Sequence, residues 1–176
     1  FAAISPSSGT VRTVELFDEN FLQSVRSMEE VQEADARRNI AARVEVAPGE
    51  WKNISLFVIA LSHRSVKEGS EENNERLEYL GDAILSGVVA DYLFKRYPYK
   101  GEGFLTEMRS KMVNRATLNE VALRMGLKKI TYYNKSDSSL KISQIFGNTL
   151  EALVGAVYLD IGYEKTRRWV FQRIVI

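Results

Sequence analysis

The sequence predicts an all-α fold. Apolar residues recur at helical spacing in several separate segments of the 176-residue chain. The one strand candidate is a weak alternation over 43–46, which ends in an Ala-Pro-Gly turn. Helices without a sheet to cover must bury their apolar faces against one another, so we expect helix-on-helix packing.

The composition is that of an ordinary globular chain. Hydrophobic residues make up 45% and charged residues 27%, while the net charge is only +1. A nucleic-acid partner would therefore need a local basic surface. The absence of cysteine excludes disulfides and thiolate metal sites, which fits a reducing compartment such as the cytoplasm, with an organelle as the alternative. No apolar run reaches the roughly 18 residues that span a bilayer, so we expect no membrane partner.

Residues 1–50 are predicted to form an N-terminal extension with one amphipathic helix. Apolar residues between Phe17 and Val31 recur at helical spacing, and Asp18 can cap a helix over 19–34. The chain begins with Phe1, so we expect a processed product or a piece of a longer chain. Nothing in this extension points to chemistry, and its role stays open.

The next predicted helix starts near Ile54 and carries Leu56, Ile59 and Ala60 on one face. His63, the only histidine, follows at the same spacing. We interpret it as a hydrogen-bonded residue closing the helix C-terminus, where a cation gains about 0.3–1 kcal/mol, rather than as a catalytic base. The polar residues 66–73 are expected to form a loop.

The central predicted helix covers 74–96 and stops before Pro98. At about 100° per residue, its acids at i, i+3 and i+7 (Glu75, Glu78 and Asp82) share one narrow stripe. The apolar residues Leu77, Leu80, Ile84 and Val88 are expected on the opposite side.

This acidic stripe has a cost for the helix. Like charges at this spacing repel by a few tenths of a kcal/mol. Gly81 in its middle costs roughly 1 kcal/mol relative to alanine. From spacing alone the stripe is either a solvated face or part of a site that serves something other than helix stability.

The remaining segments complete a helical domain. After a turn at 99–103, apolar residues from Phe104 onward predict one broken helix or two consecutive helices that end at Gly126. The polar residues 130–141 are expected to form a mobile loop. A last amphipathic helix continues through 165–174.

A second polar pair lies on the predicted helix over 148–160. Asn148 and Glu151 share a face, while small residues (Gly147, Ala152, Gly155 and Ala156) would let another helix approach closely. Two such helices could bring oxygens from Glu78, Asp82, Asn148 and Glu151 around one divalent cation. Oxygen ligands without His or Cys favour Mg²⁺ or Mn²⁺ over zinc.

Residues 74–85, NERLEYLGDAIL, closely resemble the signature of the ribonuclease III family. Residues 60–65, ALSHRS, and 107–114, EMRSKMVN, are similar to further family segments. The resemblance begins at Ile54, so we expect an endonuclease-type domain over 51–176. In the family's second acidic motif an aspartate normally stands where this chain has Asn148.

The resemblance implies a dimer-forming endonuclease domain that cuts double-stranded RNA to 5′-phosphate products, as in the processing of rRNA and mRNA precursors. It implies Glu78, Asp82 and Glu151 as metal ligands, with Asn148 able to offer only an uncharged amide oxygen. Catalytic roles fall to Glu75, Asp82 and Glu151, with Glu75 near the cleft of a homodimer. The expected cofactor is Mg²⁺, replaceable by Mn²⁺, which would orient and acidify the attacking water.

Four cations are candidates for the phosphates of double-stranded RNA, although each is also an ordinary solvated surface residue: Arg109, Lys111, Arg115 and Lys141. Two other functions remain open. The chain could be a non-catalytic double-stranded-RNA-binding subunit of a ribosome or RNA-processing complex, which Asn148 and the unusual extension favour. It could also be a protein-interaction module without RNA affinity. Divalent-metal binding between Glu78 and Glu151 would separate the enzyme from both.

Overall fold

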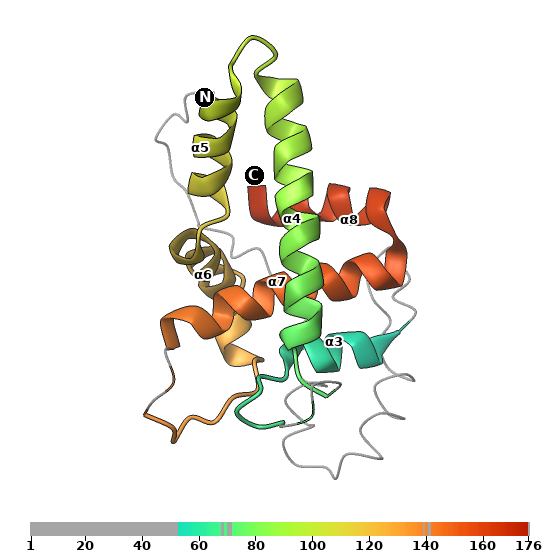
Figure 1. Cartoon of the computed structure of the whole chain (residues 1–176). Helices are drawn as coiled ribbons and strands as arrows, with labels where there is room; N and C mark the ends of the chain where they lie inside the picture. The colour runs from blue at the N-terminus through green and yellow to red at the C-terminus, as the bar shows by residue number, and fades with distance from the viewer. Residues whose placement is uncertain (1–52, 68, 70–71, 139, 141, 176) are drawn as a thin grey trace, which may run out of the picture.

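The computed structural model describes residues 53–67, 69, 72–138, 140 and 142–175 (Figure 1). The predicted helix over 19–34 and the strand candidate at 43–46 lie outside these residues. Within the described part the only bridge pairing is Ser62 with Tyr132, so the all-α prediction is confirmed. The helices are α3 (Ile54–Leu61), α4 (Glu75–Arg96), α5 (Glu102–Met112), α6 (Arg115–Arg124), the 3₁₀ turn η1 (Leu127–Lys129), α7 (Ile142–Ile161), α8 (Tyr163–Val170) and the π turn η2 (Phe171–Val175).

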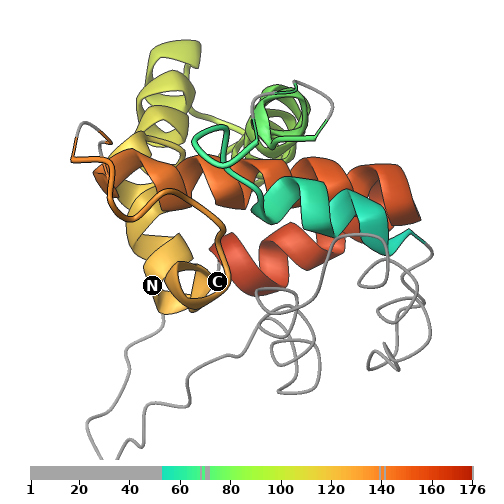
Figure 2. The same ribbon diagram turned by 90° about the horizontal axis from the view of Figure 1, so that it is seen from below.

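Helix α7 is the centre of the domain. Helices α3, α4, α6 and α8 all pack against it, and the two views show it running through the middle of the molecule (Figures 1 and 2). Its apolar side is fully buried, including Leu150, Leu153 and Val157. The polar pair Asn148 and Glu151 is only half-buried, because it lies on the side of α7 that faces the start of α4 and the start of α6.

Two glycines allow α4 to cross α7 at very short range. A Cβ on Gly81 would lie 1.7 Å from the backbone oxygen of Glu151, and one on Gly155 would lie 2.4 Å from the backbone oxygen of Leu77. Neither distance is possible for a real side chain, so both positions require glycine for close approach. The cost of Gly81 within a helix is therefore explained by packing between helices.

Helix α4 confirms the prediction over 74–96 almost to the residue, with Asn74 at the N-cap position and Tyr97 at the C-cap. The predicted core face is only partly right. Leu77 and Val88 are buried, but Leu80 and Ile84 are half-buried. Because α4 crosses α7 at Gly81, its buried face includes residues that follow one another at about one helical turn: Gly81, Leu85, Val89 and Leu93.

The segment predicted as one broken helix or two consecutive helices forms two separate helices, α5 and α6. The chain breaks between them at Asn114, whose side chain accepts a hydrogen bond from the backbone N–H of Thr117 at 2.9 Å and so caps α6. Gly126 adopts the left-handed conformation with φ of 79° just beyond α6, as predicted for a terminating glycine.

The segment after η1 departs from the predicted mobile loop. No helix forms in its described residues before α7, but Ile130 and Thr131 are buried. The backbone N–H of Tyr132 donates to the carbonyl of Leu61, and the N–H of His63 donates to the carbonyl of Tyr132, both at 2.8 Å. Polar composition predicted a free loop, whereas these bonds anchor its first part to the end of α3.

The C-terminal helix begins at Tyr163, after Gly162 with φ of 77°, and continues from α8 into the π turn η2. It confirms the predicted amphipathic helix, and its buried residues are Thr166 and Val170. None of the helices in the described part of the chain is long and apolar enough to cross a bilayer.

Candidate metal and RNA site

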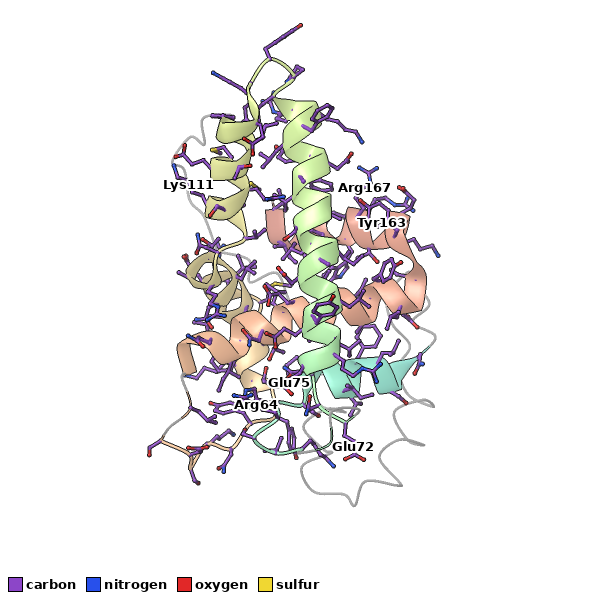
Figure 3. All side chains as sticks on the ribbon, viewed as in Figure 1. Arg64, Glu72, Glu75, Lys111, Tyr163 and Arg167 are labelled. Atoms are coloured by element: carbon purple, nitrogen blue, oxygen red, sulfur yellow. The ribbon has the colours of Figure 1, made fainter. Side chains whose placement is uncertain are left out.

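An open cavity of about 930 Å³ lies where the first turns of α4, the first half of α7 and the start of α6 meet. Polar side chains dominate its lining. Figure 3 shows Glu75 and Arg64 close together at the foot of α4, and both residues line this cavity. The full lining is His63, Arg64, Asn74, Glu75, Glu78, Tyr79, Asp82, Val113, Asn114, Arg115, Leu140, Gln144, Ile145, Asn148 and Glu151.

All five residues predicted for catalysis or metal binding line this one cavity. Glu75, Glu78 and Asp82 come from α4, whereas Asn148 and Glu151 come from α7. The glycine crossing brings the two helices together directly beneath them, since Gly81 precedes Asp82 and its Cα faces the backbone of Glu151. Two stripes that are 66 or more residues apart in sequence thus form one surface.

Glu151 is the most perturbed acid of the cavity. Burial and the neighbouring carboxylates of Asp82 and Glu78 raise its pKa to about 7, while Arg115 acts in the opposite direction. A carboxyl with this pKa exchanges its proton near neutral pH. In the absence of a cation, the folded site is therefore unfavourable for a fully charged set of acids.

Glu78 lies between opposing influences. Burial raises its pKa most, and the charge of Glu75 adds to the rise. The side-chain amide of Asn148 donates a hydrogen bond that favours the charged form and lowers the pKa, as do the cations of Arg115 and Arg64. The net shift remains upward, so Glu78 and Glu151 are perturbed in the same direction.

Glu75 occupies the rim of the cavity and pairs with a cation. The Arg64 guanidinium donates to its carboxylate at 3.1 Å, and both side chains are substantially exposed. Arg64 and Arg115 thus flank the acids from two sides, one before α4 and one at the start of α6. Two guanidinium groups beside a carboxylate cluster provide donors that phosphate oxygens can accept.

The four predicted RNA contacts do not share one place. Arg115 lines the cavity. Arg109 and Lys111 lie on the exposed surface of α5 and do not line it; Lys111 pairs with Glu107 at 2.6 Å and is seen on the outer side of α5 in Figure 3. Lys141 lies outside the described residues.

The cavity is also lined by three residues that no sequence pattern had indicated: His63, Arg64 and Gln144. His63 is hydrogen-bonded, as predicted, but it lies beyond the end of α3: its Nδ1 accepts from the backbone N–H of Ser65 at 3.2 Å. Burial and Arg64 lower its pKa, which favours the neutral ring. The position of the segment that carries His63 depends on the hydrogen bond from its backbone N–H to the carbonyl of Tyr132, a contact that no local sequence pattern predicts.

The donor set fits a hard divalent cation. Within the described residues, no three Asp, Glu or His side chains converge closely enough to enclose a metal ion. They instead line an open cavity in which burial and mutual repulsion raise the pKa of Glu151. A divalent cation would relieve this repulsion, and oxygen donors from carboxylates and an amide are the ligands that Mg²⁺ and Mn²⁺ accept.

The chain is similar in sequence to a known family of proteins. The family model for Ribonuclease-III-like proteins matches residues 53–176. A Ribonuclease 3 of Bacteroides thetaiotaomicron is 48% identical over 127 residues, and one of Phocaeicola vulgatus is 50% identical over 128 residues. Both matches cover 70% of this chain but only 40% and 41% of the relatives, so the chain spans less than half of their length.

Solved structures agree with the sequence matches. The nuclease domain of ribonuclease III from Campylobacter jejuni, in a study of a region involved in dimer formation, is 28% identical with a TM-score of 0.65, covering 90% of this chain and 99% of that domain. Dicer from Pichia stipitis is 26% identical with a TM-score of 0.54, covering 72% of this chain and 56% of that one.

Proposed function

The chain belongs to the ribonuclease III family, and from this membership we propose that it is a divalent-metal-dependent endoribonuclease that hydrolyses double-stranded RNA. One observation carries the proposal. Glu75, Glu78, Asp82, Asn148 and Glu151 come from two helices and line one open cavity, although burial and the neighbouring carboxylates of Asp82 and Glu78 disfavour the charged form of Glu151. A purely structural domain has no need of half-buried acids that face one another.

In this proposal Glu78, Asp82, Asn148 and Glu151 would hold Mg²⁺, with Mn²⁺ able to replace it. The bound cation would supply an acidified water and neutralise charge that builds on the phosphate. The residues of the chain do the rest. Glu151 would lose its proton when the cation binds, and Glu75 is a further acid at the rim. The products would carry 5′-phosphates, with staggered 3′ ends.

The RNA backbone would be held by cations around the acids. Arg64 and Arg115 flank the cavity, and the exposed Arg109 and Lys111 of α5 extend the basic surface beyond it. Double-stranded RNA is recognised mostly through its shape, phosphates and 2′-hydroxyls, so such contacts need no base sequence. Precursors of rRNA and mRNA, processed in the cytoplasm, are the substrates that this reading favours.

A homodimer completes the proposal. The outward side of α4 presents an exposed apolar stripe formed by Tyr79, Ala83, Gly87 and Phe94. Tyr79 is 83% exposed and Phe94 is 71% exposed, which is unusual for aromatic residues on a helix that is otherwise packed. Because Tyr79 also lines the cavity, a second copy on this stripe would place the two cavities on either side of the seam.

The amide side chain of Asn148 supports a second candidate function. Asn148 contributes no charge, so the metal would be held by fewer negative ligands than a fully acidic set provides. If this loss abolishes metal binding, the chain would be a double-stranded-RNA-binding subunit of a ribosome or processing complex that has the fold without the reaction.

Cleavage of labelled duplex RNA separates the two functions. The protein should cut the duplex in Mg²⁺ and stop when a chelator is added. Glu151→Gln should lose at least roughly a hundredfold in rate, because a ligand and its charge are removed. Glu120→Gln, an exposed position on α6 outside the cavity, is the matched control and should keep the full rate. Tight RNA binding without cutting, even in excess Mn²⁺, would instead establish the non-catalytic subunit.

A further inference from the structure

Asn148 is the uncharged member of the proposed ligand set, and its surroundings give it a role of its own. It lies on α7 one turn before Glu151 and faces Glu78 of α4 across the cavity. Its amide donates a hydrogen bond to the Glu78 carboxylate. Asn148 is half-buried, so this bond is shielded in part from competing water.

A carboxylate at position 148 would have the opposite effect. It could not donate to Glu78 when ionised, because a carboxylate only accepts hydrogen bonds. It would also add a fourth negative charge beside Glu78, Asp82 and Glu151, which line the same cavity, at a half-buried position. Like charges brought together in a partly desolvated cavity repel more strongly than on an open surface.

We propose that Asn148 is a positioning residue for the metal-free site: its amide holds the Glu78 carboxylate in the cavity, and its missing charge limits repulsion among the remaining acids. The consequence is a compromise between two states. The empty site is stabilised, whereas cation binding is weaker than a fourth carboxylate would make it. The metal half of this inference rests on the proposed function, but the stability half does not.

Two measurements on the full chain test the inference: thermal unfolding in EDTA at pH 8, and calorimetric titration with Mn²⁺ alone. Asn148→Asp should lower the melting temperature in EDTA by roughly 2–4 °C. It should also raise the affinity for Mn²⁺ by on the order of tenfold, because ligand charge sets the strength of such sites. Asn148→Ala should cause a smaller loss of melting temperature, since it removes the hydrogen bond without adding charge, and should not tighten Mn²⁺ binding.

The pairing with Glu78 is tested by a double variant. In Glu78→Gln combined with Asn148→Asp, an amide again faces a carboxylate across the cavity, so most of the lost melting temperature should return. Asn134→Asp is the matched control, because Asn134 is exposed and its Oδ1, which an aspartate retains, accepts from the backbone N–H of Ser136. It should leave both the melting temperature and the Mn²⁺ affinity unchanged.

The outcomes separate this inference from the proposed function. An Asn148→Asp protein that is as stable as the wild type in EDTA, or is not rescued by Glu78→Gln, overturns the positioning role even if RNA is cut. A protein that shows the stability pattern but binds no Mn²⁺ and cuts no RNA supports the positioning role and overturns the proposed function. If Asn148→Asp fails to fold while Asn148→Ala folds, the repulsion argument is supported.

Discussion

The crossing of α4 and α7 and the cavity beside it are neighbours with opposite physical character. At the crossing, Gly81 and Gly155 let backbone meet backbone, and the surrounding residues such as Leu85 and Leu150 are fully buried. Less than one helical turn away, Asp82, Glu78 and Glu151 face an open cavity in which burial and repulsion raise the pKa of two of the three acids. One region is packed for stability, and the other is destabilising without a cation.

The contrast explains how the second region can exist. Close packing at the crossing fixes the two helices against each other, so the acids cannot move apart by separating the helices. Their repulsion therefore persists in the folded state, where it contributes to the raised pKa of Glu78 and Glu151 and favours the binding of a cation. In this view the glycines are as necessary to the site as the acids, although they touch no ligand.

The largest effect is expected from adding one methyl group at the crossing. In Gly81→Ala the new Cβ would lie 1.7 Å from the backbone oxygen of Glu151 and 2.8 Å from the backbone nitrogen of Gly155, so the helices must separate. The neighbours are backbone atoms and cannot rotate away. We expect a loss of more than about 3 kcal/mol in the free energy of unfolding, measured by urea denaturation.

The control for this variant is Gly103→Ala in α5, where the added Cβ would lie in open space, with no atom of another helix within 4 Å. Alanine is the better helix former, so this protein should be as stable as the wild type or more stable by up to about 1 kcal/mol. If Gly81→Ala were equally harmless, close packing would not be what holds the two halves of the site together.

A smaller effect is expected from pH in the metal-free protein. Because the pKa of Glu151 is about 7 in the folded state against an ordinary 4.5, the folded protein retains a proton over this range that the unfolded chain has lost. The free energy of unfolding should therefore fall as pH rises from 4.5 to 7 and level off above it. Solvent reaches this carboxyl, so we expect a fall of about 1–2 kcal/mol, less than the full shift would give.

Glu151→Gln is the test of this assignment. Glutamine does not titrate, so the variant should be more stable than the wild type in EDTA at pH 8 and nearly equal to it at pH 4.5, as measured by urea denaturation at both values. Part of the fall should persist because Glu78 is shifted in the same direction. If the difference in stability were the same at both pH values, the group with the raised pKa would not be Glu151.

The sequence predicted much of this molecule because its strongest signals are local. Helical spacing and Pro98 placed α4, and the stripe of Glu75, Glu78 and Asp82 lies on one side of that helix as expected. Small residues at Gly147 and Gly155 correctly indicated a close helix neighbour. The pairing of these two helices was predicted from their polar faces, but the residues at which they cross were not local information. The core face of α4 was therefore predicted with an error that follows directly from the position of the crossing.

The parts of the site that were missed depend on contacts between distant segments. His63 and Arg64 reach the cavity because the segment after α3 is bound to Tyr132, about 70 residues later. The same contact turns the first part of the predicted loop over 130–141 into an anchored segment. Arg64 had no helical face or motif spacing to connect it with Glu75, so its pairing could be found only in three dimensions.

The smallest effect is expected from this pair at the rim of the cavity. Arg64 and Glu75 are 3.1 Å apart, but their side chains are 67% and 46% exposed, in contrast to the more buried Glu151. Exposed ion pairs contribute about 0–1 kcal/mol, so Arg64→Ala should lower the free energy of unfolding by less than about 1 kcal/mol, and less still at high salt.

A double-mutant cycle with Glu75→Ala, measured by urea denaturation, isolates the pair from other effects. A coupling above about 2 kcal/mol would show that the rim is a structural element like the crossing. A small coupling would leave both side chains free to turn toward RNA at little cost to the fold.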